Sequence, residues 1–183
     1  MDSVEHREAL DLVHFWLRAG PVRWFDRNDG FDEACRGWVN TWERACKGYC
    51  DDWARTATGS LALIILFDQI PRNSFRGLAD QFASDDKALA AADAAVAAGH
   101  DRSQVMPVQN FFYLPYQHAE DLAAQERGLD LYRVAGDQNA YFYALVHADA
   151  IRRFGRFPHR NPILGRESTA EEIAYMESGG FAN

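Results

Sequence analysis

A short segment near the carboxyl end of the chain concentrates side chains that bind anions. Residues 152–168 read RRFGRFPHRNPILGRES and contain five arginines and one histidine beside a single acidic residue, Glu167. The chain as a whole carries a formal net charge of −8, so this segment runs against the average. Arginine stays charged in any protein environment, and its planar guanidinium can bind both oxygens of a carboxylate or phosphate. The segment therefore predicts binding of an acid, from the same chain or from a ligand.

Two earlier segments place polar side chains where apolar runs end. One continues from the apolar run 61–67 into Asp68 and Arg72, and the other contains His118 and Glu120. A carboxylate at the end of a buried helix needs a partner, because stranding a buried charge costs several kcal/mol. We expect these two segments to converge with His147 and with the arginine-rich segment.

The convergence has two interpretations, and the sequence leaves both open. In the first, Arg156, Arg160 and Arg166 brace carboxylates such as Asp68, Glu120 and Asp121 as structural ion pairs. In the second, the same groups line a pocket for a small anionic molecule or a peptide carboxylate. The candidate ligand-binding residues are Asp68, Arg72, Asn73, His118, Glu120, His147, Arg156, His159, Arg160, Asn161 and Arg166.

Acid–base catalysis is an alternative use of the same residues. His118 or His147 could act as a general base oriented by Glu120 or Asp121, since imidazole titrates near neutral pH. His118 and Asp121 are also competent metal ligands and could share a helix face, but HExxH and paired ExxH motifs are missing from the sequence. GxSxG, Walker A and GxGxxG motifs are missing as well. We expect neither a metal nor a cofactor, and the candidate catalytic residues are His118, Glu120 and His147.

Composition limits the partners and the compartment. A pI near 5.2 disfavours nucleic acid, because a polyanion would be repelled outside the local basic segment. The longest apolar run, Leu61–Phe67, is seven residues, whereas a membrane span needs about 20. The three cysteines form no paired motif, and the first residues lack a secretory signal. We expect a soluble cytoplasmic protein with free, largely buried thiols.

The elements that position these residues are predicted to be helices. Apolar residues recur at helical spacing, and Ser, Asp, Gly and Pro stand where helices begin and end. A capping box of Ser168 and Glu171 is expected to start the last helix, and Ser84 is expected to cap the alanine-rich one. The expected helices cover residues 4–18, 31–46, 61–70, 85–98, 115–134 and 137–154, and a segment after Ser168.

Three longer strings resemble a known family. LALIILFDQIPRNSFRG (61–77), FFYLPYQHAEDLAAQE (111–126) and RFGRFPHRNPILGRESTAEE (153–172) are similar to the signature blocks of the bacterial family called domain of unknown function 924. HFWLRAG and RWFDRNDGFD extend this resemblance over nearly the whole chain. One departure is Ala119, where the family pattern has serine between His118 and Glu120.

This resemblance implies a fold but no activity. It suggests one all-α domain over residues 1–183, a bundle of about seven or more helices arranged as tetratricopeptide-like antiparallel hairpins. No 34-residue repeat is visible in the sequence itself, so this arrangement depends on the resemblance. A binding protein, an enzyme and a protein-interaction scaffold therefore remain as alternatives.

Overall fold

The described part of the chain, residues 6–180 of the computed structural model, consists of helices and turns with no β-strand. It divides into two compact units, Met1–Pro115 and Tyr116–Asn183, which are described here one at a time. The prediction of an all-α fold is confirmed. The single-domain organisation and the tetratricopeptide-like arrangement stay predictions.

The amino-terminal unit is built from six α-helices within the described residues, joined by short 3-10 turns. Its helices are α1 (Arg7–Phe25), α2 (Asp29–Arg36), α3 (Val39–Cys46), α4 (Ala57–Ile64), α5 (Ile70–Ser74) and α6 (Asp85–Ala97). The connecting turns are η1 (Asp51–Arg55), the π-helical turn η2 (Ile65–Gln69), η3 (Ala79–Phe82), η4 (His100–Ser103) and η5 (Val108–Phe112).

Two predicted helices of this unit differ from the structure at a glycine. The first was expected to stop at Gly20, but α1 bends there and continues to Phe25, since Gly20 adopts a φ of 76° and a ψ of 168° that break the helix without ending it. Its expected start at Val4 lies outside the described residues. The second was expected to be continuous over 31–46, but a tight turn at Gly37 separates α2 from α3.

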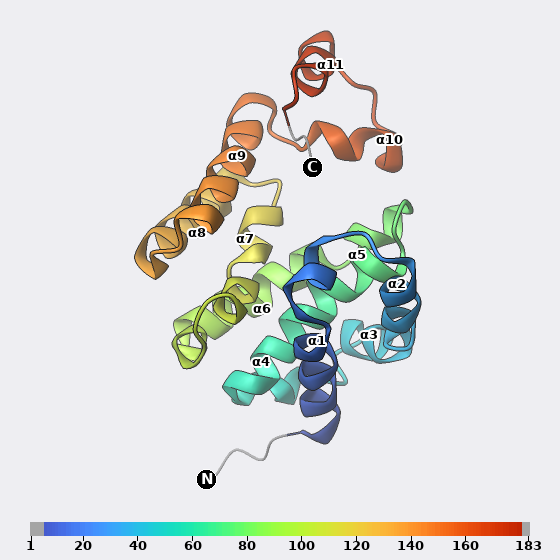
Figure 1. Cartoon of the computed structure of the whole chain (residues 1–183), viewed down its shortest axis with the longest axis vertical. Helices are drawn as coiled ribbons and strands as arrows, with labels where there is room; N and C mark the ends of the chain where they lie inside the picture. The colour runs from blue at the N-terminus through green and yellow to red at the C-terminus, as the bar shows by residue number, and fades with distance from the viewer. Residues whose placement is uncertain (1–5, 181–183) are drawn as a thin grey trace. The chain divides into compact units, whose positions relative to one another are not determined.

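Helix α4 forms the centre of the amino-terminal unit, as its nearly all-apolar sequence predicts. Every residue from Gly59 to Pro71 is buried. Helices α1 and α6 and the turn η1 pack around α4 (Figure 1). Helix α4 begins earlier than expected, because Thr56 rather than Thr58 or Ser60 caps it and accepts a hydrogen bond from the Gly59 N–H at 3.0 Å.

Pro71 was expected to stop this helix, but helical backbone continues to Ser74. The π-helical turn η2 explains the difference. It shifts the hydrogen bonding so that the Ile70 N–H pairs with the Ile65 carbonyl, which leaves Pro71 in the first turn of α5, where no N–H is needed.

Ser84 precedes α6 as predicted, but its side chain does not cap this helix. Its hydroxyl instead donates to the Phe67 carbonyl at 2.6 Å and accepts from Trp42 Nε1 at 2.9 Å. Ser84 therefore links three elements of the core rather than one helix end.

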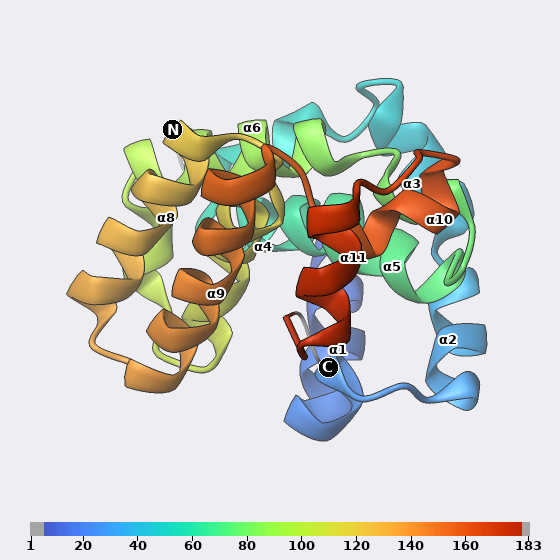
Figure 2. The same cartoon turned by 90° about the horizontal axis from the view of Figure 1, so that it is seen from above.

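The carboxyl-terminal unit contains a helical hairpin followed by short elements. Its helices are α7 (Leu114–His118), which begins just before the unit boundary, α8 (Leu122–Ala135), α9 (Gln138–Phe154), η6 (Pro158–Arg160), α10 (Asn161–Leu164) and α11 (Ala170–Glu177). Helices α8 and α9 pack side by side (Figures 1 and 2). Gly136 in a left-handed conformation and the capping residue Asp137 connect them, so the two helices run antiparallel.

Two predictions for this unit need correction. The helix expected over 115–134 is interrupted after His118, because the Asp121 side chain starts a new helix by accepting from the Ala124 N–H at 2.8 Å. The capping box of the last helix is formed by Thr169 and Glu172 rather than by Ser168 and Glu171.

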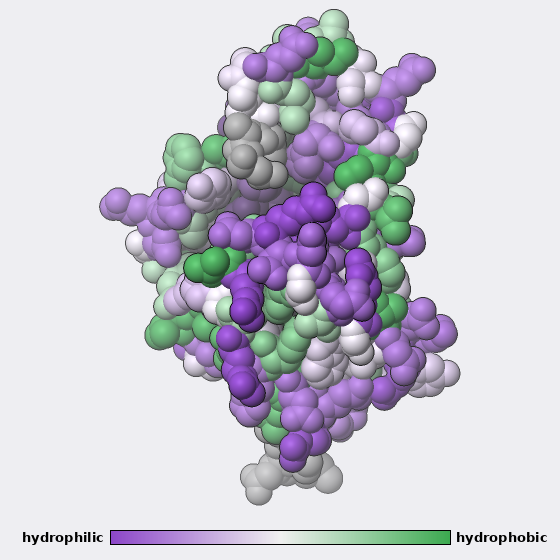
Figure 3. Space-filling model, turned by 45° about the vertical axis from the view of Figure 1, so that its right-hand side comes forward, coloured by the Kyte–Doolittle hydropathy of each residue, from purple (hydrophilic) through white to green (hydrophobic). Residues whose placement is uncertain are grey.

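The described structure has a largely hydrophilic face and free cysteine thiols, as the amino-acid composition predicts. Hydrophilic residues cover most of the face in Figure 3, and hydrophobic residues appear there as separate patches. Cys35, Cys46 and Cys50 are free thiols, and burial raises the pKa of Cys35 to about 12. Within the described ranges, no helix combines the length and apolar character that crossing a bilayer requires.

Candidate functional site

An ionic network in the amino-terminal unit surrounds the polar end of η2. The Arg72 guanidinium lies 2.9 Å from Asp68 Oδ1 and donates to both Asp85 oxygens at 2.8 and 3.0 Å. The Asp68 side chain is only 1% exposed. Burial lowers the pKa of Arg72, but the carboxylates of Asp68 and Asp85 more than offset this effect and raise it. Asp68 thus has an arginine partner one helical turn along its own chain.

The same segment also stabilises its irregular backbone. Arg72 donates to the Asp68 carbonyl at 2.7 Å, and the Asn73 amide donates to the Gln69 carbonyl at 2.9 Å. These carbonyls belong to the π-helical turn, whose regular hydrogen bonding is disturbed. The polar residues after α4 therefore hold the turn in place, which favours the structural interpretation for Arg72 and Asn73.

In the carboxyl-terminal unit, Glu120 binds the arginine-rich segment. Arg166 donates to its two oxygens at 2.7 and 2.9 Å, and the Phe157 N–H donates to Oε1 at 2.7 Å. Burial raises the pKa of Glu120, but the hydrogen bonds from Arg166 and Phe157 lower it by more. The pKa therefore lies below its ordinary value. The expected brace between Arg166 and Glu120 is confirmed. Because both oxygens are engaged, Glu120 is poorly placed to orient a histidine.

A second brace joins Arg156 to Glu172. Arg156 donates to the two oxygens of this buried carboxylate at 2.6 and 2.9 Å, and the Asn161 amide donates to it at 3.2 Å. Arg156 above all holds the pKa of Glu172 at about 2. Asn161 also accepts from Arg166 Nε at 2.9 Å, so it connects the two ion pairs. Two arginines of the segment are therefore bound to carboxylates of the same unit.

Three imidazole rings and one guanidinium gather around Phe157. The ring centroids of His147 and His159 lie 5.6 and 5.5 Å from that of Phe157, and the centroids of His118 and His147 are 6.3 Å apart. The Arg160 guanidinium lies 4.6 Å from the Phe157 ring and donates to the His118 carbonyl at 2.9 Å. We call His118, His147, His159 and Arg160 the histidine–arginine cluster.

The hydrogen bonds of His147 define its tautomer. Its Nδ1 lies 2.8 Å from the Tyr143 carbonyl, which can only accept, so Nδ1 carries the proton. Its Nε2 then accepts from the Gln117 amide at 3.4 Å. Tyr143, one turn earlier on α9, and Gln117 on α7 thus fix the orientation of this ring.

The partly buried imidazoles of His147 and His159 are held in the neutral form. Burial is the largest cause that lowers the pKa of His147, to about 3, and that of His159, to about 4. The charge of Arg160 and the other imidazoles of the cluster lower both values further, while Glu120 opposes this at His159. The electrostatic environment of these two rings is therefore net positive, in a chain whose total charge is negative.

The described residues show no metal-ligating constellation. No group of three or more His, Cys, Asp or Glu side chains among them is arranged to hold a metal ion. His118 ends α7, whereas Asp121 caps the next helix, so the expected shared helix face is absent. The expectation that the protein uses no metal or cofactor stays a prediction.

The predicted site residues thus fall into two groups. The amino-terminal unit brings together Asp68, Arg72 and Asn73, and the carboxyl-terminal unit brings together His118, Glu120, His147, Arg156, His159, Arg160, Asn161 and Arg166. Their expected convergence across the two units stays a prediction. The sequence reasoning missed Asp85 and Glu172, although both stand in the first turn of a predicted helix, where an acidic residue is usually assigned to the helix dipole.

These features define an all-helical protein with a braced polar network in each unit. The chain belongs to the family described as bacterial protein of unknown function (DUF924), whose profile matches residues 12–180. It is also similar to a solved structure, a protein of unknown function from Agrobacterium tumefaciens, with 45% identity and a TM-score of 0.90. That match covers 94% of this chain and 98% of the other. A comparison with curated proteins finds no match.

Proposed function

We propose that the histidine–arginine cluster binds a small anionic molecule or a peptide carboxylate. The observation that carries this function is the gathering of three imidazoles and the Arg160 guanidinium around one aromatic ring. A guanidinium supplies the fixed positive charge that an acid requires, and an imidazole N–H that is not engaged by the backbone, as that of His147 is, can donate a hydrogen bond to it.

The different contacts of the arginines in residues 152–168 support this proposal. Arg156 and Arg166 are bound to Glu172 and Glu120, so we assign them the role of holding the segment in place. Arg160 donates to the His118 carbonyl and lies against the Phe157 ring, which places its guanidinium within the cluster. His118, His147 and His159 are partly exposed, which gives a ligand access to their rings.

The remaining candidate residues stabilise the backbone of the unit to which they belong. In the carboxyl-terminal unit these are Glu120 and Asn161, and in the amino-terminal unit they are Asp68, Arg72 and Asn73.

Binding of acids to a matched pair of variants tests this function. Arg160→Met removes the buried guanidinium, whereas Arg152→Met removes a side chain that is 60% exposed and 3.7 Å from Glu126. We expect titration calorimetry with phosphate, acetate and a short peptide to detect at least one ligand. Its affinity should fall roughly tenfold or more in Arg160→Met and stay unchanged in Arg152→Met.

Equal affinities of the two variants would argue against the cluster as the binding site. The enzyme alternative makes a different prediction for His118→Ala, which should then abolish turnover of a bound acid while its affinity is retained. A pKa of about 3 makes His147 a weak general base near neutral pH, so His118 is the stronger candidate for that role.

A further inference from the structure

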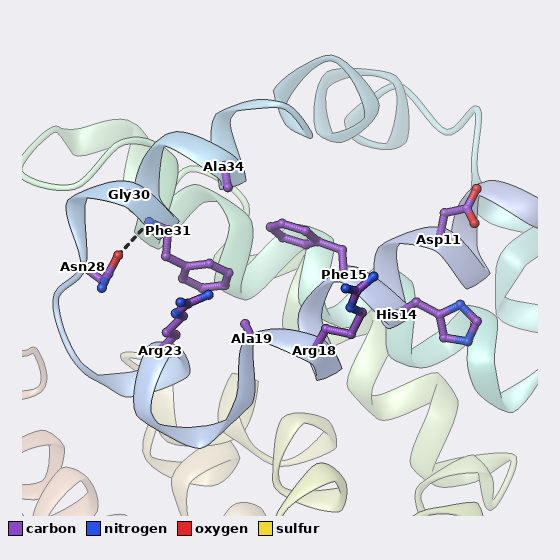
Figure 4. A pocket seen from close by; sticks show the side chains of 10 residues that line it. All are labelled: Asp11, His14, Phe15, Arg18, Ala19, Arg23, Asn28, Gly30, Phe31 and Ala34. Carbon is purple, nitrogen blue, oxygen red and sulfur yellow. Dashed lines mark hydrogen bonds between the residues drawn. The ribbon is translucent and has the colours of Figure 1, made fainter.

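A pocket of about 730 Å³ lies on the amino-terminal unit and belongs to none of the networks above (Figure 4). Side chains of α1 and of the start of α2 line it. Its volume is within the range of about 300–1,000 Å³ that is typical of small-molecule sites. The feature that distinguishes this pocket is its positive charge.

The bend in α1 brings two arginines to the same pocket. Arg18 lies just before Gly20 and Arg23 just after it, and both side chains line the pocket (Figure 4). At a φ of 76° the backbone of Gly20 adopts a conformation that other residues rarely take. A straight helix would place positions 18 and 23 five residues apart, on different faces. The glycine bend is therefore what makes the pair possible.

The described part of the chain offers these arginines no partner. Within residues 6–180, the side chains of Arg18, Arg23 and the neighbouring His14 form no hydrogen bond or ion pair, and all three are exposed. Asp11 also lines the pocket, but its carboxylate is bound to Arg7 at 3.1 Å. Most other arginines of the unit have carboxylate partners, namely Arg7, Arg27, Arg36, Arg44, Arg72 and Arg76.

An aromatic pair forms the apolar part of the pocket. The rings of Phe15 and Phe31 are stacked with centroids 5.6 Å apart and planes inclined by 18°. Phe31 is held in position by α2, whose N-cap residue Asn28 accepts a hydrogen bond from its N–H at 2.9 Å. Phe15 is partly exposed. Phe31 is only 5% exposed and supports Phe15 from the core, so a flat apolar group can lie against Phe15 while an acidic group reaches the arginines.

We propose that this pocket binds a small planar organic acid, an aromatic carboxylate or an aromatic phosphate ester. The guanidinium groups of Arg18 and Arg23, which have no partner among the described residues, recognise the acid, and Phe15, supported by Phe31, recognises the aromatic body. A chain with a net charge of −8 repels anions in general, so selective binding requires both parts of the ligand. This second site is independent of the histidine–arginine cluster.

Titration with four probes separates the two parts of this recognition. Benzoate and phenyl phosphate carry both features, whereas inorganic phosphate carries only the charge and benzyl alcohol only the ring. We expect the first two to bind and to shift the Nε–H signals of Arg18 and Arg23 in NMR spectra. The other two should bind at least roughly tenfold more weakly.

Variants of surface arginines complete the experiment. The double variant Arg18→Gln with Arg23→Gln should weaken both acids by roughly tenfold or more. Arg55→Gln, an exposed arginine outside the pocket, should leave their affinity unchanged. Arg160→Met should also leave it unchanged, which distinguishes this site from the proposed acid site of the other unit. Unchanged binding in the double variant, or no binding to the unmodified protein at millimolar probe concentrations, would overturn the proposal.

Discussion

The arginines of this protein separate into two kinds by what their guanidinium groups contact. Arg72, Arg156 and Arg166 bind carboxylates in bidentate or bridging geometry, whereas Arg18 and Arg23 contact no acid among the described residues. A paired arginine stabilises the fold, because its removal strands a carboxylate. An unpaired one beside a pocket is available to a ligand. Substitution of a carboxylate-bound arginine should therefore lower the stability of the fold, whereas substitution of Arg18 or Arg23 should weaken ligand binding.

Arg72→Met tests the structural role. This change leaves Asp68, which is 1% exposed, without the guanidinium that neutralises it, and it also removes the donor to the Asp68 carbonyl. We expect the free energy of unfolding to fall by about 3–5 kcal/mol in urea denaturation. The control is Arg7→Met, which breaks an ion pair whose arginine is 88% exposed and should cost less than about 0.5 kcal/mol. Similar losses in the two variants would contradict the assignment of Asp68 as a buried charge.

The sequence predicted that these carboxylates need arginine partners, but it did not always predict which arginine binds which carboxylate. The need of Asp68 for an arginine followed from its place after an apolar run, and the expected brace between Arg166 and Glu120 is present. Glu172 was not singled out in the sequence, where Glu171 was assigned to the capping box, and its pairing with Arg156 depends on how the chain folds back over sixteen residues. Local sequence patterns cannot predict a contact between residues that far apart in the chain.

At the scale of elements, the apolar pattern located the helices, whereas their ends and interruptions, such as those at Gly37 and after His118, depended on individual residues. Thr56 caps α4 although Thr58 and Ser60 are equally suitable by type. The π-helical turn before Pro71 is a second example, since it arises from packing around α4 and from side-chain hydrogen bonds to free carbonyls. Periodicity alone cannot indicate such an insertion.

Gly59→Ala tests how closely α4 approaches the turn η1. A Cβ at this position would lie 2.0 Å from the Trp53 carbonyl oxygen, and this backbone atom cannot move aside like a side-chain tip. Alanine favours a helix over glycine by about 1 kcal/mol, but the overlap outweighs that gain. We expect a net loss of about 2 kcal/mol or more in the free energy of unfolding.

The matched control for this change is Gly30→Ala, also in the first turn of a helix. An added Cβ there would come no closer than 3.4 Å to another group, the Asn28 side-chain oxygen. We expect this variant to be as stable as the unmodified protein or slightly more stable. If Gly59→Ala behaved in the same way, α4 and η1 would have to be farther apart than the structure places them.

For the whole molecule, composition and motif order predicted the fold class and the family, and both are confirmed. Function is harder to predict, because it depends on which charges remain available once the chain has satisfied its own. The sequence drew attention to residues 152–168, yet four of those five arginines, Arg152, Arg153, Arg156 and Arg166, form ion pairs with carboxylates of the same unit. The pocket of Arg18 and Arg23 was missed because its basic residues are few and separated by a bend that the sequence suggested would end the helix.

The buried histidines should make the stability of the protein depend on pH. Unfolding restores the pKa of His147 and His159 to about 6.5, whereas in the folded chain the pKa values are about 3 and 4. As the pH falls below 6.5, the unfolded chain takes up protons that the folded chain does not, so folding becomes less favourable. Each histidine contributes up to about 1.4 kcal/mol per pH unit until the pH reaches its folded pKa.

Urea unfolding between about pH 7 and pH 5 measures this effect in isolation. Glu172 has a folded pKa of about 2 against an ordinary 4.5, so the stability that it contributes is lost only as the pH falls below that range. We expect the unmodified protein to lose stability over the window and the double variant His147→Gln with His159→Gln to lose about 2–3 kcal/mol per pH unit less. His159→Gln alone should give about half of that difference if the double variant folds poorly. Parallel pH profiles of the variants and the unmodified protein would mean that these rings are already protonated, or open to solvent, in the folded chain.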